Sequence, residues 1–367
     1  MLACLGSLAY PWWRGAAPAP RITFICLMER SRSPSRSVLL CSGGARLTRR
    51  SGLRLTAHRF PALSRKSGAD ACSLGCTDGV TIRMSTPSVG DLSDVVCTLR
   101  EWQNDASPMQ LHPGDLGWFW QYGAEATAAA VRIWSLDGLP LAIGMLDSSE
   151  ILRLTISPNA RRDEALGRQL VADAANPERG VLPAGKVAVE APNGTLVQEL
   201  LVEGGWNLDE AWTPLRRDLT EPVEEPGLRV EVVRPEQAPT YTAVHRSSFS
   251  SPRLTDELWH AMTAGIPYGD ARCLLAYDDH GNAVAEVTVW ASGAGKPGLL
   301  EPMGVHTDYR GRGFGRAICL AAAAALLDLG ASCAVVCTPS SNAAAIATYK
   351  SAGFQPLPER HDRSRHA

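Results

Sequence analysis

The sequence predicts an α/β fold of the α+β type, in which two tandem domains each form a mixed, mostly antiparallel sheet flanked by helices. Segments with the apolar alternation of strands are interspersed with segments of helical periodicity over most of the chain. One order of elements occurs twice: a strand, an arginine-led turn, a helix, a second strand, an asparagine-led helix and a glycine–aromatic ending. A repeat of this length, about 150 residues, indicates a duplicated domain rather than a solenoid.

The domain boundaries follow from residues 221–227, a polar and proline-rich segment with the composition of a linker. We expect a first domain over residues 79–220 and a second over residues 228–367. Residues 1–78 are rich in Arg, Ser, Gly and Pro and show no sustained periodicity. We expect a disordered basic extension there, such as one produced by a start codon placed too far upstream.

Charge is distributed unevenly along the 367 residues, whose net charge is −2. Residues 1–83 carry +10 and the remainder −12, and an acidic folded part argues against a nucleic-acid partner. The basic extension is also compatible with an organelle transit segment, or with a tail that contacts nucleic acid or anionic lipid. Pro11 and Arg14 interrupt its first apolar segment, which makes a poor secretory signal. Without a run of eighteen apolar residues we expect no membrane partner.

The first domain is expected to begin with a strand at residues 80–84. A hairpin at residues 131–147 turns at Asp137-Gly138, a favoured pair for a two-residue turn. The remaining expected elements are a strand at 151–158, a turn at 161–168 leading into a helix that ends at 175, a strand at 186–190, a helix from 193 and a closing segment at 209–219.

The second domain is expected to contain a strand at 228–233, helices at 236–245 and 255–264, a hairpin at 272–291, a strand at 299–306, a helix at 317–329, a strand at 332–338 and a helix from 342. After Phe354 only a tail rich in Pro, Arg and His remains. We therefore expect a C-terminal sheet that is short, or that another segment completes, such as one from a partner subunit.

Residues 309–316 lie between the strand expected at 299–306 and the helix expected at 317–329, and they read Y-R-G-R-G-F-G-R. Glycines let the backbone coil so that successive N–H groups face inward, and the start of the helix adds unpaired donors and the positive end of its dipole. Three arginines add positive charge. Such a turn predicts a ligand that carries a diphosphate, and the Gly-Lys-Ser/Thr of a Walker loop is absent.

The spacing of two motifs carries a family resemblance over residues 228–355. Arg310, Gly313 and Gly315 fit R-x-x-G-x-G, and residues 342–354 fit N-x-x-A-x-x-x-Y-x-x-x-G-F. Together they resemble the GNAT superfamily of N-acetyltransferases. The resemblance implies acetyl-CoA as co-substrate and an amine of a small molecule or peptide as acceptor. The tandem arrangement distantly resembles mycothiol synthase-like enzymes, on architecture alone.

The same resemblance implies the residues that bind acetyl-CoA. The backbone of the strand before the turn faces the pantetheine arm, and the turn holds the diphosphate. Asn342 is either a contact to CoA or the N-cap of its helix, since asparagine is a favoured cap. The expected cofactor-binding residues are Met303, Val305, Arg310, Gly311, Arg312, Gly313, Phe314, Gly315, Arg316 and Asn342.

Tyr349 is the expected acid that protonates the leaving thiolate, because a phenol pKa of ~10 and a thiol pKa of ~8.5 are close. The alternative is a packed tyrosine with its hydroxyl on water. Glu301 is the expected general base, the alternative being a carboxylate satisfied by neighbouring N–H groups. His306 is the second candidate for the base. We interpret His245 and Trp290 as structural or cleft-lining residues.

The first domain is expected to be a degenerate copy. Asp163 and Glu164 stand where the second domain has its glycine turn, and Leu201 stands at the place of Tyr349. Two carboxylates at that position repel a diphosphate. We expect this domain to support the fold or to shape the acceptor cleft.

Of the ten cysteines, Cys72 and Cys76 are closely spaced, but no second Cys/His pair follows them at zinc-site spacing. We therefore expect no metal, no disulfide framework and a reducing compartment such as the cytoplasm. Two other functions stay open. One is a non-catalytic acyl-CoA-binding or sensing protein, and the other is an interaction scaffold in which both domains are inactive. The sequence leaves open which amine is the acceptor and whether the chain forms a homo-oligomer.

Overall fold

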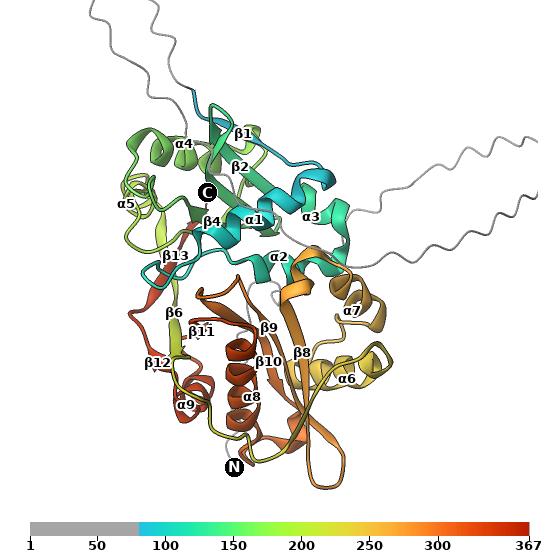
Figure 1. The fold of residues 1–367 in the computed structure, drawn as a ribbon. Coiled ribbons are helices and arrows are strands. Elements are labelled where there is room, and N and C mark those ends of the chain that lie inside the picture. The colour runs from blue at the N-terminus through green and yellow to red at the C-terminus, as the bar shows by residue number, and fades with distance from the viewer. Residues whose placement is uncertain (1–80, 367) are drawn as a thin grey trace, which may run out of the picture. The chain divides into compact units, whose positions relative to one another are not determined.

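The computed structural model describes residues 81–366, and these form the α+β fold that the sequence predicts (Figure 1). The strands of both halves join in one continuous mixed sheet, where a separate sheet was expected for each domain. The strand order is β1-β2-β3-β4-β5-β13-β6-β11-β10-β9-β8-β7, with β12 added beside β6. The predicted extension at residues 1–78 and the first residue of the predicted strand at 80–84 lie outside the described residues.

Elements of the first half, up to residue 220, alternate between the sheet and its covering helices. They are β1 (Arg83–Ser85), α1 (Leu92–Trp102), α2 (Pro113–Phe119), α3 (Ala124–Ala130), β2 (Val131–Leu136), β3 (Leu139–Ser148), β4 (Ile151–Ile156), α4 (Glu164–Ala175), β5 (Lys186–Glu190), α5 (Leu196–Glu203) and β6 (Asn207–Asp218), with 3₁₀ turns η2 (Val89–Asp91), η3 (Trp120–Tyr122) and η4 (Pro177–Arg179).

Elements of the second half, from residue 228, follow the same plan. They are β7 (Arg229–Val232), α6 (Ala238–Phe249), α7 (Asp256–Thr263), β8 (Ala271–Tyr277), β9 (Ala283–Trp290), β10 (Gly298–Val305), α8 (Phe314–Asp328), β11 (Cys333–Pro339), α9 (Ala343–Ser351), β12 (Gln355–Pro356) and β13 (Arg360–His366), with 3₁₀ turns η5 (Pro235–Gln237), η6 (Ile266–Asp270) and η7 (Thr307–Tyr309).

The two halves share one connection, in which a helix joins two neighbouring parallel strands. In the first half α4 joins β4 to β5, and in the second α8 joins β10 to β11. Figure 1 shows α8 lying across β9 and β10. Its buried residues, among them Ile318 and Leu326, pack on the sheet together with Leu300 and Phe354 in one apolar cluster. Burial of this face fixes the start of α8 next to the end of β10.

The ends of the halves are exchanged within the sheet, which the sequence does not predict. The last strand, β13, lies between β5 and β6, and β6 in turn pairs with β11. The C-terminal tail therefore does form a strand. The expectation of a sheet completed by another segment is met by β6 of the same chain, which pairs along β11 from Cys333↔Asp218 to Pro339↔Trp212.

Helix α2 of the first half packs on the sheet of the second half. A Cβ atom at Gly114 or Gly117 would lie 2.6 or 2.3 Å from the ring of Trp290, so both positions require glycine. Trp118 belongs to the same apolar cluster as Tyr241 and Trp290. The first half thus covers one face of the second. Within residues 81–366, no helix has the length and apolar character that crossing a bilayer requires.

Candidate functional site

Strands β10 and β11 separate soon after they begin. They pair in parallel at Gly298↔Ala334 and Leu299↔Val335, while β10 continues to Val305 and β11 to Pro339. The pairing of β10 with β9 shifts register between Leu300 and Met303. This irregularity re-aims the end of β10 and leaves a gap between two parallel strands.

The edge of β10 that faces this gap carries backbone donors. The N–H of His306 donates to the carbonyl of Val284 on the β9 side, at 2.9 Å. Successive N–H groups of a strand point to alternate edges, so those of Val305 and Met303 point away from β9 and into the gap. These are the two residues that the sequence assigns to the pantetheine arm.

The loop after β10 presents a second set of donors. Gly311 and Gly313 have φ values of +75° and +88°, which only glycine adopts without strain. Among residues 81–366, no group accepts a hydrogen bond from the backbone amides of residues 311–316. These amides stand at the N-terminus of a 15-residue helix, whose dipole adds positive potential. An anion of the size of a diphosphate fits this arrangement.

The arginines of the loop differ in what they contact. The guanidinium of Arg310 donates to the carbonyl of Ser248 at the end of α6, and at 3.4 Å to the carbonyl of Val305. Arg316 donates to the carbonyl of Ser351 on α9, at 2.9 Å. These two side chains fix the loop and α8 to their neighbours. The guanidinium of Arg312 is exposed and lies 5.4 Å from the ring centre of Tyr309.

Gly315 and Phe314 belong to the packing of the loop. A Cβ atom at Gly315 would lie 2.8 Å from a methyl carbon of Thr348, so glycine permits the close approach of α8 to α9. Phe314 is half-buried and meets the ring of Tyr309 edge-on at 6.3 Å. Both residues therefore stabilise the loop by packing, Gly315 against α9 and Phe314 against Tyr309.

Asn342 and Tyr349 lie at the two ends of α9. The Oδ1 atom of Asn342 accepts from the N–H of Ala345 at 3.1 Å, which is the capping role that the sequence left open. Tyr349 is 6% exposed and packs on Phe354 with ring centres 5.8 Å apart. None of the described residues forms a hydrogen bond with its hydroxyl.

The environment of Tyr349 keeps its phenol protonated. Burial raises the pKa of Tyr349 well above its ordinary value, and the neighbouring groups Cys319 and Glu301 raise it further. A neutral phenol is the form that can give up a proton.

Glu301 is a half-buried carboxyl on β10, at the point where β10 leaves β11. Burial raises the pKa of Glu301 to about 8; Arg153 opposes this shift, and three carboxylates of the first half reinforce it. No described N–H group donates to the carboxyl oxygens. The indole N–H of Trp290 donates to the backbone carbonyl of Glu301 at 2.7 Å and so holds this residue in place.

His306, the second candidate for the base, and His245, which was interpreted as structural or cleft-lining, both form contacts elsewhere. His306 accepts from the N–H of Asp308 at 3.3 Å and caps the 3₁₀ turn η7. His245 is buried on α6, with its Nδ1 atom 3.1 Å from the carboxylate of Glu286. Within the described part of the chain, neither histidine forms a hydrogen bond or ion pair with Glu301 or Tyr349.

A buried charge cluster beside Glu301 comes largely from the first half, and sequence reasoning missed it. Arg153 lies 2.5 Å from Asp115, 3.4 Å from Glu190 and 3.7 Å from Asp147. These groups stand on α2, β3, β4 and β5, and all of them act on the pKa of Glu301. The signal in the sequence was slight: Arg153 is a single charge inside the apolar strand Ile151–Ile156.

The corresponding loop of the first half is closed by its own contacts. The N–H of Leu196, at the start of α5, donates to the carbonyl of Arg161 at 2.9 Å. Arg162 forms an ion pair with Glu199 at 2.5 Å, and Asp163 caps α4 by accepting from the N–H of Leu166. A diphosphate would have to displace these contacts.

Comparison with known proteins gives a family match for part of the chain and a shared fold. Residues 236–354 match the family model described as "Acetyltransferase (GNAT) family". A tandem GNAT protein from the clavulanic acid biosynthesis pathway, solved without AcCoA, is 16% identical; the match covers 78% of this chain and 98% of that one, with a TM-score of 0.52. A GNAT-family acetyltransferase from Colwellia psychrerythraea is 13% identical over 78% of this chain and 100% of that one, also with a TM-score of 0.52. At these identities the two structures share the fold. The curated proteins include no match.

Proposed function

We propose that the second half of this chain, whose residues 236–354 match the GNAT acetyltransferase family, moves an acetyl group from acetyl-CoA to an amine of a small molecule or peptide. The observation that carries the proposal is the row of unpaired amides at residues 311–316, next to the open edge of β10. A thioester with a diphosphate handle is the ligand that these two features complement together.

The residues have separate tasks in this proposal. The amides of residues 311–316 hold the diphosphate, and exposed Arg312 adds charge at its rim. The N–H groups of Met303 and Val305 hold the pantetheine arm along β10. One of them also polarises the thioester carbonyl, as an oxyanion donor does. Arg310, Arg316 and Gly315 position the loop through the contacts described above.

Proton transfer is assigned to two residues that approach the gap from different elements. Glu301, with a pKa of about 8, accepts the proton that the amine loses as its nitrogen bonds to the acetyl carbon. Tyr349 donates its proton to the CoA sulfur as the carbon–sulfur bond breaks. The raised pKa makes Glu301 a stronger base. The raised pKa of Tyr349 keeps its phenol protonated, but it also makes the phenol a weaker acid than a free tyrosine and widens the difference from the thiol pKa.

Two measurements made side by side test the proposal against its rivals. Calorimetric titration with acetyl-CoA reports binding, and thiol release with a panel of amines reports turnover. We expect both. Binding without turnover supports the acyl-CoA-sensing function instead, and the absence of binding supports the scaffold.

A further inference from the structure

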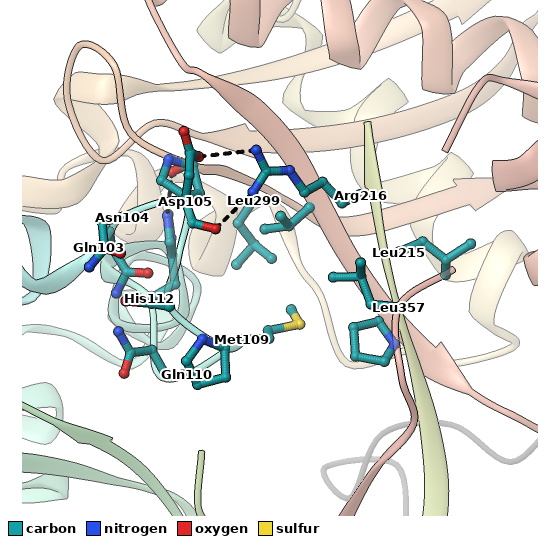
Figure 2. A pocket seen from close by; sticks show the side chains of 15 residues that line it. Gln103, Asn104, Asp105, Met109, Gln110, His112, Leu215, Arg216, Leu299 and Leu357 are labelled. Atoms are coloured by element: carbon teal, nitrogen blue, oxygen red, sulfur yellow. Dashed lines mark hydrogen bonds and ion pairs between the residues drawn. The ribbon is translucent and has the colours of Figure 1, made fainter. Parts of the chain in front are cut away.

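A cavity of about 140 Å³ lies between the first half and the sheet of the second, on the face opposite α8 (Figure 2). One wall is the segment at residues 103–112, between α1 and α2. The other wall comes from β6, β10, β11 and the residue after β12. The lining residues are Gln103, Asn104, Asp105, Ser107, Pro108, Met109, Gln110, His112, Pro214, Leu215, Arg216, Pro297, Leu299, Val335 and Leu357.

Polar contacts hold the first wall against the second half. The carboxylate of Asp105 accepts from the hydroxyl of Ser332 at 2.7 Å and lies 3.4 Å from the guanidinium of Arg216. Figure 2 shows Arg216 reaching across to Asp105 at the rim of the cavity. His112 contacts the carbonyl of Pro297 at 3.3 Å. Arg216 also pairs with Asp218 at 2.9 Å, so one guanidinium is shared between two carboxylates at the rim.

The inside of the cavity combines apolar side chains with polar ones, and one of the polar groups is an unsatisfied acceptor. Met109 lies between the first wall and the side chains of Leu215 and Leu357 (Figure 2). Gln110 is 5% exposed, and its Nε2 atom donates to the carbonyl of Trp102 at 3.2 Å. Its Oε1 atom is buried and accepts no hydrogen bond from the described residues. A buried acceptor without a donor is costly, so a donor from a ligand would relieve it.

The floor of the cavity and the proposed catalytic base, Glu301, lie on the same strand, β10. Leu299 and Val335 form the last paired rung of β10 and β11. Glu301 is two residues further along β10, roughly 7 Å away, and its carboxyl interacts with the charges of Arg153 and Asp115 in the first half. The two regions are also joined through α2, since the N–H of His112 donates to the carboxylate of Asp115, a neighbour of Glu301, at 2.7 Å.

We propose that this cavity, built jointly by both halves, holds the body of the acceptor, and that the acceptor is a compact primary amine with a ring-sized apolar body and one hydrogen-bond donor for Gln110. The inference rests on the proposed function, because it takes Glu301 as the group that meets the amine. An apolar cavity of about 150 Å³ admits a molecule such as benzene. The apolar side chains on the floor of the cavity disfavour a long polycation, which cannot keep its charges hydrated there.

The first test compares three amines as acceptors: tyramine, phenethylamine and spermidine. We expect kcat/KM for tyramine to exceed that for phenethylamine by about five-fold to a hundred-fold, since only tyramine can donate to Gln110. In a Gln110→Met variant this preference should vanish, because neither amine then meets an amide acceptor. A wild-type preference for spermidine, or an unchanged preference in the variant, would overturn the proposal.

The second test fills the cavity and keeps acetyl-CoA binding as a separate readout. Val335→Phe should raise the KM for tyramine at least ten-fold, whereas Val202→Phe, the same change at an exposed site on α5, should not. Leu357→Trp, at a position that is 40% exposed, repeats the test where the substitution is easily accommodated. An unchanged KM in both cavity variants overturns the inference but leaves the proposed function standing.

Direct calorimetry with tyramine makes the inference independent of turnover. If acetyl-CoA fails to bind the wild-type protein, the proposed function fails. Tyramine binding that is lost in Val335→Phe and Leu357→Trp still supports the cavity as an amine site, and the absence of tyramine binding to the wild type rejects it.

Discussion

The guanidinium of Arg360, at the start of the last strand, lies 2.8 Å from the carboxylate of Glu190, at the end of β5 in the first half. Arg360 also pairs with Asp362, at 2.8 Å. Burial acts to raise the pKa of Glu190, but Arg360 and Arg153 outweigh it and lower that pKa to about 2. The exchanged strand β13 therefore places a buried cation where the carboxylates of the first half require one.

Replacing Arg360 tests how far the exchanged strand stabilises the fold. Arg360→Met leaves the buried carboxylates of Glu190 and Asp362 with fewer cations, and we expect the free energy of unfolding to fall by about 3–5 kcal/mol. Urea denaturation measures this change. The matched control is Arg162→Met, because the Arg162–Glu199 pair is more than half exposed and should contribute no more than ~1 kcal/mol. Equal losses in the two variants would contradict the role given to β13.

The activity should depend on pH through Glu301. A base with a pKa of about 8 is mostly protonated at pH 7, so kcat/KM should rise as the pH passes through 8. In Glu301→Gln we expect kcat to fall about 10²- to 10⁴-fold, with no rise near pH 8 and unchanged affinity for acetyl-CoA. Glu225→Gln, at an exposed linker position, is the control. A wild-type profile that is flat between pH 7 and 9 would remove Glu301 from the mechanism.

The same carboxyl should make the fold less stable at high pH. Its pKa is raised on folding, so between its ordinary value of 4.5 and about 8 the folded state binds more protons than the unfolded state. Stability must fall as the pH rises across this window. Glu301→Gln lacks this penalty and should melt at a higher temperature than the wild type at pH 8.5, with a smaller difference at pH 5. A difference that does not change with pH would show that the folded-state pKa of Glu301 is ordinary.

Tyr349→Phe separates proton donation from packing. The ring still fills its place against Phe354, so acetyl-CoA affinity and stability should change little, while kcat should fall about 100-fold or more. Thiol release and calorimetry report the two quantities. Tyr277→Phe removes a hydroxyl on β8 that bonds to Gln237, and serves as the matched control. Equal kcat values for Tyr349→Phe and the wild type would exclude Tyr349 as the acid.

Local patterns were sufficient to predict the elements around the loop. The hairpin at Asp137-Gly138 forms with φ values of +50° and +80°, as that residue pair favours. The strand expected at residues 299–306 is β10, and the helix expected at 317–329 begins three residues earlier, at Phe314. The earlier start follows from Gly313, whose left-handed backbone allows the helix to begin directly after it.

Contacts between distant segments could not be predicted in the same way. Helices α1 to α3 were missed, and so was the exchange of β6 and β13, because strand order depends on pairing between residues that are up to 180 positions apart, as His366 and Lys186 are. The charge cluster around Arg153 and the cavity beside Gln110 depend on the same long-range contacts. Single charges in apolar strands, such as Arg153, are the feature that could have directed attention to the cluster.

The central claim is that the amides of residues 311–316 hold the diphosphate of coenzyme A, and calorimetric titration of Gly313→Asp with CoA tests it most directly. The matched control is Gly281→Asp, since Gly281 has a similar φ of +82° and equally open surroundings in the β8–β9 turn. Both variants introduce the same backbone strain and the same charge. We predict that Gly313→Asp weakens CoA binding at least 100-fold, while Gly281→Asp binds as the wild type does. Undiminished CoA affinity in Gly313→Asp would contradict the claim.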